Sequence, residues 1–267
     1  MLGPEVLSQI ATHGRARLAA VGIPPGVQDG LFARATSWDT WGPTWDAQGE
    51  DQQASARDLL RRGHHMSAGE AFHLAALFSH FGQLVLFHHI PTKDRLSRKR
   101  EAAFRAGAEH LAPPARVFRV DTPGGGALRA SLRLPVGRAG RAPCVEENLT
   151  FSDVLLRRGL AVVCLDGPGQ GETRQDLPFA HDSERWVAPL VRQVAQDPAI
   201  DPDRLGRAGF SFGGYLAPRV AAFLPEIKAC AVLGGCTDLS DRETLPALPK
   251  EDFAHVFGGR TWAEAAE

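Results

Sequence analysis

The spacing of apolar residues divides the chain into two parts near residues 113–114. Before this point apolar residues recur every three or four positions, as is typical of amphipathic helices. The spacing predicts helices over residues 4–20, 67–88 and 92–111, with Pro91 in the first turn of the third. The helix over 67–88 is apolar over a wide face, so we expect it to be central in a helical bundle.

Ser67 and Glu70 have the spacing of a capping box at the start of that helix. In a capping box, the two side chains hydrogen bond to backbone N–H groups that the first helical turn leaves without acceptors. This pair therefore predicts where the helix begins.

After residue 114 the pattern changes to short apolar runs. Two strand-like segments flank three glycines and predict a β-hairpin over residues 116–134. The following segments alternate between strand-like runs at 160–165, 205–210 and 227–233 and helical runs at 147–158, 182–196 and 212–224. Strands that alternate with helices predict an α/β fold with a doubly wound, mostly parallel sheet.

The two patterns predict two domains, a helical N-terminal domain over residues 1–113 and an α/β core over residues 114–267. Apolar residues make up 43% of the chain and charged residues 23%, an ordinary composition for a soluble protein. The formal net charge of −1 favours neither nucleic acid nor an anionic membrane as a partner. The sequence shows no signal-peptide pattern, so a cytoplasmic protein is the default expectation.

The residue pattern does not predict a metal or a cofactor. The four cysteines lack C-x-x-C spacing, and the chain contains no H-E-x-x-H motif. Residues 167–172 begin like a dinucleotide motif, but the third motif glycine falls at Glu172 and no helix follows directly. A glycine-rich loop at the mouth of a substrate site fits this stretch better.

Residues 209–215 read G-F-S-F-G-G-Y and contain the pattern G-x-S-x-G. In many hydrolases this pattern places a nucleophilic serine on a tight turn between a strand and a helix. A strand-like run precedes Ser211 and a helical run follows it, so we interpret Ser211 as the nucleophile. The backbone N–H of Phe212 is then an oxyanion donor, and Gly209 and Gly213 are expected to leave room for the turn.

These two stretches give the chain a family resemblance. D-G-P-G-Q-G-E at 166–172 followed by the serine motif resembles α/β-hydrolases of the group of FrsA-like esterases and dihydroxypseudooxynicotine hydrolases. The resemblance extends to the tryptophan-rich residues 37–41 and to S-A-G-E at 67–70. It implies a lid-like helical domain ahead of the hydrolase core. It also implies a small carbonyl substrate, either an ester or a ketone cleaved at a C–C bond.

Two departures from the family pattern bear on catalysis. A strand and the loop that supplies the second oxyanion donor are missing between Val145 and Glu146. Glu146 and Glu147 match the family's paired glutamates, and each is a candidate site residue or a solvated residue at a helix start. The family's late acidic residue and histidine are not recognisable before Glu267, which predicts a truncated core.

Asp238 and His255 are the candidates that remain for an acid and a base. The order Ser211, Asp238, His255 matches the serine–acid–histidine order of this fold. However, the residues around His255 predict a short helix rather than a loop over the site.

The sequence therefore supports two main hypotheses. The chain is a serine hydrolase that forms a covalent acyl-enzyme, or it is an inactive fragment or binding module derived from one. A dinucleotide-dependent enzyme is a third hypothesis. A homodimer is compatible with each of them.

Overall fold

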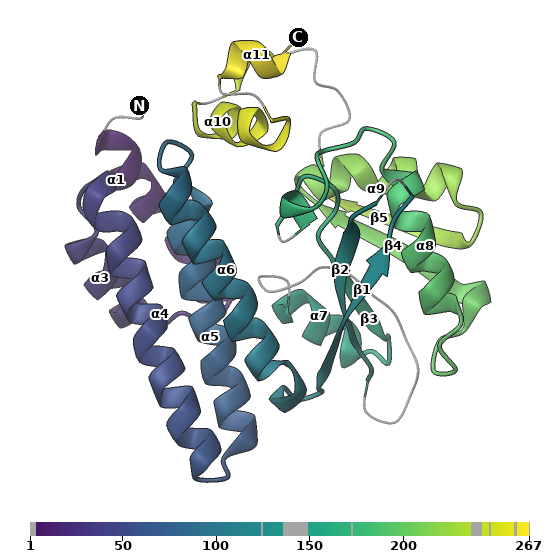
Figure 1. Cartoon of the computed structure of the whole chain (residues 1–267), viewed down its shortest axis with the longest axis horizontal. Helices are drawn as coiled ribbons and strands as arrows, with labels where there is room; N and C mark the ends of the chain where they lie inside the picture. Colours follow the sequence, from purple (N-terminus) through teal and green to yellow (C-terminus); the bar gives the residue numbers. More distant parts are fainter. Residues whose placement is uncertain are drawn as a thin grey trace. The chain divides into compact units, whose positions relative to one another are not determined.

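The computed structural model describes residues 4–123, 125–135, 149–171, 173–235, 242–245, 247–258 and 261–266. They form two compact units, Met1–Pro114 and Ala115–Glu267 (Figure 1). The described residues of the first unit form helices, and those of the second form strands and helices. None of the described helices is long and apolar enough to cross a membrane.

The first unit is a bundle built around its helix α5. The unit comprises α1 (Pro4–His13), α2 (Arg15–Ala20), α3 (Pro25–Arg34), α4 (Trp38–Arg61), α5 (His65–Leu84), α6 (Ile90–Gly107) and the 3₁₀ turn η1 (Ala108–His110). Helix α5 packs against both α4 and α6. A Cβ atom on Gly82 would lie only 2.6 Å from the Cβ of Trp45 in α4, so the two helices approach closely. The predicted central helix is confirmed.

The start of α5 differs from the prediction. The helix begins at His65, and its N-cap residue His64 makes no side-chain capping hydrogen bond. Ser67 and Glu70 therefore lie inside the helix, and the predicted capping box is wrong. The N–H of Ala68 instead donates to the carbonyl of His64 at 2.9 Å, which continues the backbone ladder through Ser67.

The first predicted helix is divided. Residues 4–20 form two helices, α1 and α2, with Gly14 between them. The N–H of Gly14 still donates to the carbonyl of Ile10 at 2.8 Å, so the break is local.

Helix α4 is long, and its start is a capping box that the apolar spacing did not indicate. The hydroxyl of Ser37 accepts a hydrogen bond from the N–H of Thr40, and the hydroxyl of Thr40 accepts one from the N–H of Ser37. The indole rings of Trp41 and Trp45 lie one turn apart with centroids separated by 5.5 Å, and both side chains are buried. These large aromatic surfaces hold α4 to the bundle core.

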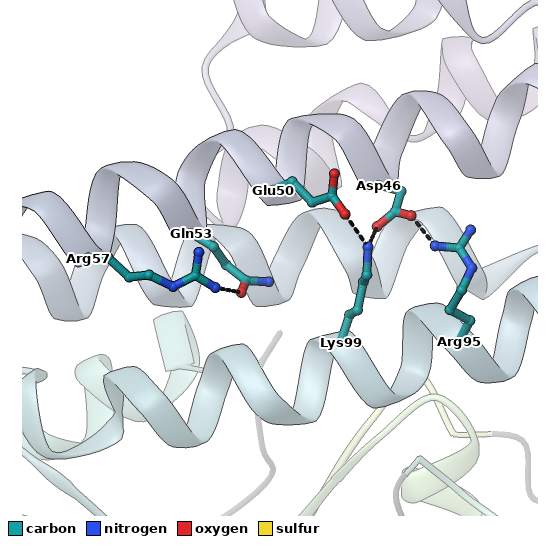
Figure 2. A network of polar contacts seen from close by, with 6 residues as sticks. All are labelled: Asp46, Glu50, Gln53, Arg57, Arg95 and Lys99. Carbon is teal, nitrogen blue, oxygen red and sulfur yellow. Dashed lines mark hydrogen bonds and ion pairs between the residues drawn. The ribbon is translucent and has the colours of Figure 1, made fainter.

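A network of charged side chains joins α4 to α6 (Figure 2). The Nζ of Lys99 donates to Asp46 at 2.6 Å and to Glu50 at 2.5 Å, and Arg95 donates to the other carboxylate oxygen of Asp46. The side chain of Asp46 is only 12% exposed. Its burial raises the pKa, but hydrogen bonds from Lys99 and Arg95 outweigh that effect and hold the pKa of Asp46 below its ordinary value.

The second unit carries the strands. It comprises β1 (Ala115–Asp121), β2 (Ala127–Arg133), α7 (Leu149–Leu156), β3 (Val162–Leu165), η2 (Thr173–Gln175), α8 (Ser183–Ala195), η3 (Pro202–Arg204), β4 (Leu205–Phe210), α9 (Phe212–Phe223), β5 (Ile227–Leu233), η4 (Arg242–Thr244), α10 (Ala247–Val256) and α11 (Trp262–Ala266). The predicted hairpin is confirmed as the antiparallel pair β1 and β2. The observed bounds of β4 and β5 match the predicted ones.

The described strands form two separate sheets. Strands β1, β2 and β3 form an antiparallel sheet in which Ala130 of β2 lies opposite Leu165 of β3. Strands β4 and β5 form a parallel pair. The two sheets are not hydrogen bonded to each other within the described residues. The position at which the sequence predicts a missing strand, between Val145 and Glu146, lies outside the described residues.

An apolar cavity separates β3 from β4. Ala161, Val163 and Leu165 line it from the β3 side, and Leu205 lines it from β4. Helix α8 closes it with an apolar stripe made of Val187, Leu190, Val191 and Val194. The cavity has a volume of about 60 Å³ and opens to solvent. Within the described residues, the two sheets share one apolar core, to which α8 contributes Val187 and Leu190.

We expect the substitution Asp46→Asn to destabilise the helical unit by about 1–3 kcal/mol, because it leaves Lys99 and Arg95 without their shared anionic partner. The matched control is Asp58→Asn. The partners of Asp58, Arg61 and Arg62, are more than half exposed, so that change should cost less than about 0.5 kcal/mol. Urea unfolding measures both values, and equal stabilities for the two variants would contradict the role of the network.

The lowered pKa of Asp46 also predicts a dependence on pH. A carboxyl whose folded-state pKa is depressed contributes stability above its unfolded-state pKa of about 3.9 and loses it as the pH falls through the folded-state value. The stability difference between the natural chain and Asp46→Asn should therefore be full at pH 6 and shrink below about pH 4. A difference that stays constant between pH 6 and pH 2.5 would exclude this linkage.

Candidate active site

Ser211 lies on a strained turn between β4 and α9. Strand β4 ends at Phe210, α9 begins at Phe212, and Ser211 between them has φ 50° and ψ −119°. It is the one residue other than glycine with a positive φ among the described residues. Such a conformation costs about 1–3 kcal/mol for a residue with a Cβ atom, and it persists only where the surroundings enforce it.

Backbone hydrogen bonds fix the turn on both sides. The N–H of Ser211 donates to the carbonyl of Leu233 at the end of β5 at 2.9 Å. The carbonyl of Ser211 accepts from the N–H groups of Gly214 at 2.9 Å and Tyr215 at 3.3 Å, which begins α9. The serine is thus attached to the neighbouring strand and to its own helix.

Two glycines permit the close approach that the turn requires. A Cβ atom on Gly209 would lie 2.0 Å from the carbonyl oxygen of Gly213, and one on Gly214 would lie 2.9 Å from the Cα of Gly235. At Gly213, a Cβ atom would meet nothing within 4 Å. The expectation of close packing is therefore right for Gly209 and wrong for Gly213, and the residue with the second tight contact is Gly214.

The hydroxyl of Ser211 and the N–H of Phe212 are positioned to act together. Ser211 is exposed, and its side chain makes no capping hydrogen bond to α9. Phe212 is the first residue of α9, so its N–H has no acceptor within the helix. The positive end of the helix dipole favours a developing negative charge at this point. The arrangement can present a nucleophile and one oxyanion donor to a carbonyl group.

An ion pair fastens α9 to α8. Arg219 donates through Nε and Nη2 to the two carboxylate oxygens of Glu184, at 2.7 and 2.8 Å. These hydrogen bonds hold the pKa of Glu184 below its ordinary value despite its burial. A bidentate pair of this kind fixes direction as well as distance, so it orients the helix that begins directly after Ser211.

The glycine-rich loop after β3 folds back on itself. Gly171 has φ 47°, and a Cβ atom on it would lie 1.7 Å from Oδ2 of Asp166. The hydroxyl of Thr173 donates to the carbonyl of Asp166 at 2.9 Å. The chain that follows brings the ring of Phe179 to 5.6 Å from the ring of Phe212. The segment after the loop thus contacts the residue next to Ser211, and the place of the loop beside a substrate site stays a prediction.

Of the other predicted site residues, His255 is the one that lies within the described residues. Glu146, Glu147 and Asp238 lie outside the described residues. His255 is on α10, which confirms the short helix predicted there, and it is half-buried. No hydrogen bond joins His255 to Ser211 in the part of the chain that the structure describes. The order Ser211, Asp238, His255 therefore stays a prediction.

An aromatic cluster beside the serine was not predicted from the sequence. The ring of Phe212 has around it the rings of Phe179, Tyr215, Phe253 and Phe257, with centroids between 5.3 and 6.3 Å away. We call these five residues the aromatic cluster. The sequence does contain a signal for part of this cluster. Phe253 and Phe257 are four residues apart, and that spacing places both rings on one face at the end of α10.

The described residues contain no group of three or more histidine, cysteine, aspartate or glutamate side chains placed to hold a metal ion. Of the two cysteines in those residues, Cys164 is buried and Cys230 is exposed. The site that the structure describes is therefore made of a serine, backbone donors and aromatic rings.

Comparisons with known proteins agree with this geometry. Residues 145–263 match the model of the FrsA-like esterase family. The chain is 31% identical over 236 residues to 2,6-dihydropseudooxynicotine hydrolase of Paenarthrobacter nicotinovorans, covering 85% of the chain and 63% of the relative. It is 28% identical to hydrolase acrC of Aspergillus aculeatus, covering 91% of the chain and 63% of that protein.

The same group appears among solved structures. The crystal structure of 2,6-dihydroxy-pseudo-oxynicotine hydrolase superimposes with a TM-score of 0.85 at 27% identity. The match covers 94% of the chain and 73% of that structure. It confirms the predicted α/β-hydrolase fold with a helical region ahead of it. The chain spans just under two thirds of the length of the first two relatives above. It has the α/β-hydrolase fold, and it is similar to FrsA-like esterases and to 2,6-dihydropseudooxynicotine hydrolase.

Proposed function

We propose that the chain is a serine hydrolase that cleaves an ester, or a C–C bond next to a ketone, through a covalent acyl-enzyme on Ser211. The observation that carries the proposal is the strained turn at Ser211, with φ 50° between β4 and α9. Strain of this kind is retained where it presents a reactive side chain. Relatives named as hydrolases support the reaction class.

The proposed reaction has two steps. The oxygen of Ser211 attacks the substrate carbonyl carbon, its proton passes to a base, and the carbonyl oxygen gains negative charge that the N–H of Phe212 stabilises. Expulsion of the alcohol or carbanion leaving group, which takes up a proton, leaves an acyl group on Ser211. Water then attacks this acyl group and releases the acid. The base is not identified among the described residues.

A second candidate is an inactive derivative of such a hydrolase that binds rather than converts its ligand. Within the described residues, neither a carboxylate nor a histidine hydrogen bonds to the hydroxyl of Ser211. A serine without its base and acid loses most of its rate advantage, and one missing oxyanion donor costs a further factor of about 10²–10³. The two candidates differ in whether Ser211 reacts at all.

Reaction with a fluorophosphonate probe, together with turnover of 4-nitrophenyl acetate, separates the two candidates. We expect the 267-residue chain to take up one probe molecule and to release 4-nitrophenol above the buffer rate. The variant Ser211→Ala should lose both signals, because the nucleophilic oxygen is gone. Ser55→Ala, at an exposed position of α4, should keep both. Absence of labelling in the natural chain would favour the binding module.

The glycines of the turn give a matched pair of variants. Gly209→Ala would force a methyl group to 2.0 Å from the carbonyl oxygen of Gly213, so the turn must open and Ser211 labelling should fall at least tenfold. Gly213→Ala places its methyl group in open space, and alanine favours a helix by up to about 1 kcal/mol. That variant should keep its labelling and melt at the same or a higher temperature. Equal labelling of the two variants would contradict the role of the strained turn.

A further inference from the structure

The aromatic cluster lies directly beside Ser211, and it is only partly covered. The Cα atoms of Ser211 and Phe212 are about 3.8 Å apart, because they are consecutive in the chain. Ser211 itself is exposed. Tyr215 is 39% exposed and Phe257 is 38% exposed, whereas Phe179, Phe212 and Phe253 are half-buried. Aromatic surface next to the proposed nucleophile is therefore open to solvent.

The rings of the cluster are packed at well-defined angles. Phe212 stacks on Tyr215 at 12°, and Phe253 stacks on Phe257 at 11°. The ring of Phe257 is nearly perpendicular to those of Phe179 and Phe212, at 86° and 89°. Stacked and edge-to-face geometries are the two arrangements that aromatic rings prefer. Another planar ring can add to the exposed side of Phe257 or Tyr215 in either geometry.

A second aromatic pair lies on the other side of Ser211 in the sequence. The ring of Phe210 is 4.5 Å from that of Phe151 in α7, and Phe151 is 47% exposed. Ser211 is thus bracketed by two phenylalanines, each of which packs against further aromatic rings. Elements far apart in the sequence supply them: α7, the segment after η2, α9 and the end of α10.

We propose that the aromatic cluster is a specificity-determining surface that binds an aromatic ring close to the carbonyl carbon of the substrate. The inference rests on the proposed function, in which Ser211 attacks that carbonyl carbon. A saturated ring of the same size gains burial and dispersion energy at this surface, but it lacks the electrostatic attraction between ring faces and ring edges. An aromatic pair contributes about 2- to 10-fold in affinity beyond the buried area.

The test compares two amides of nearly equal size, phenylacetamide and cyclohexylacetamide, which do not need a reactive serine. Their affinities for the natural chain and for Ser211→Ala are measured by saturation-transfer NMR. Phenylacetamide should bind about 2- to 10-fold more tightly than cyclohexylacetamide to both proteins. Equal affinities, or no saturable binding of either amide, would overturn the proposal.

Variants of the aromatic cluster locate the effect. Phe257→Leu and Phe253→Leu each replace an aromatic ring with an aliphatic side chain and keep most of the apolar volume. Each variant should therefore abolish the preference for phenylacetamide. Phe257 is more exposed and follows the last residue of α10, so its variant keeps the test valid if Phe253→Leu fails to fold. Phe223→Leu, on α9 at 60% exposure and outside the aromatic cluster, should leave the preference unchanged. A preference that survives Phe257→Leu would contradict the assignment.

Ester hydrolysis is measured as well, so that failure of this inference can be distinguished from failure of the proposed function. The rates of hydrolysis of methyl phenylacetate and methyl cyclohexylacetate are compared in the natural chain. If the phenyl amide binds preferentially but neither ester is hydrolysed, the aromatic surface stands and the hydrolase function fails. If both esters are hydrolysed at equal kcat/KM and the amides bind equally, the hydrolase function stands and the aromatic surface fails.

Discussion

The close approach of α9 to β4 at Gly209 is the constraint on which the candidate site depends. The carbonyl oxygen of Gly213 occupies the space that any side chain at position 209 would need, so the helix can begin immediately after the strand. The backbone of Ser211, between these two glycines, has its positive φ at this approach. The same approach sets the direction of the Phe212 N–H and places the ring of Phe212 among the other aromatic rings. The hydrogen bond from Ser211 to Leu233 then joins the turn to β5.

Local sequence signals predicted the strands and the turn well. The run that became β5 is mostly apolar and ends before two glycines, and the run that became β4 ends at the serine motif, so the limits of both strands could be predicted. The capping box at Ser67 was misread, because a serine and a glutamate three residues apart also occur inside a helix. Helix α4 gave no clear signal, since Gly42, Pro43 and Gly49 interrupt its apolar spacing.

Contacts between residues far apart in the sequence could not be predicted from these local signals. The aromatic cluster joins residue 179 to residues 212 and 253, and no spacing rule connects positions that far apart. The importance of Gly214 over Gly213 also depends on a remote partner, Gly235. Glycines that face open space and glycines in tight contact look identical in a sequence. Only the fold shows which one a side chain would disrupt.

Ion pairs join helices in both units, around Asp46 in the first and between Arg219 and Glu184 in the second. The second unit also has an apolar cavity between β3 and β4. Because the cavity opens to solvent, water meets apolar side chains of β3, β4 and α8 in the folded state. Each square ångström of such surface that a larger apolar side chain covered would add about 25 cal/mol to the stability of the fold. The unit that carries Ser211 therefore has room to become more stable by substitution within its own core.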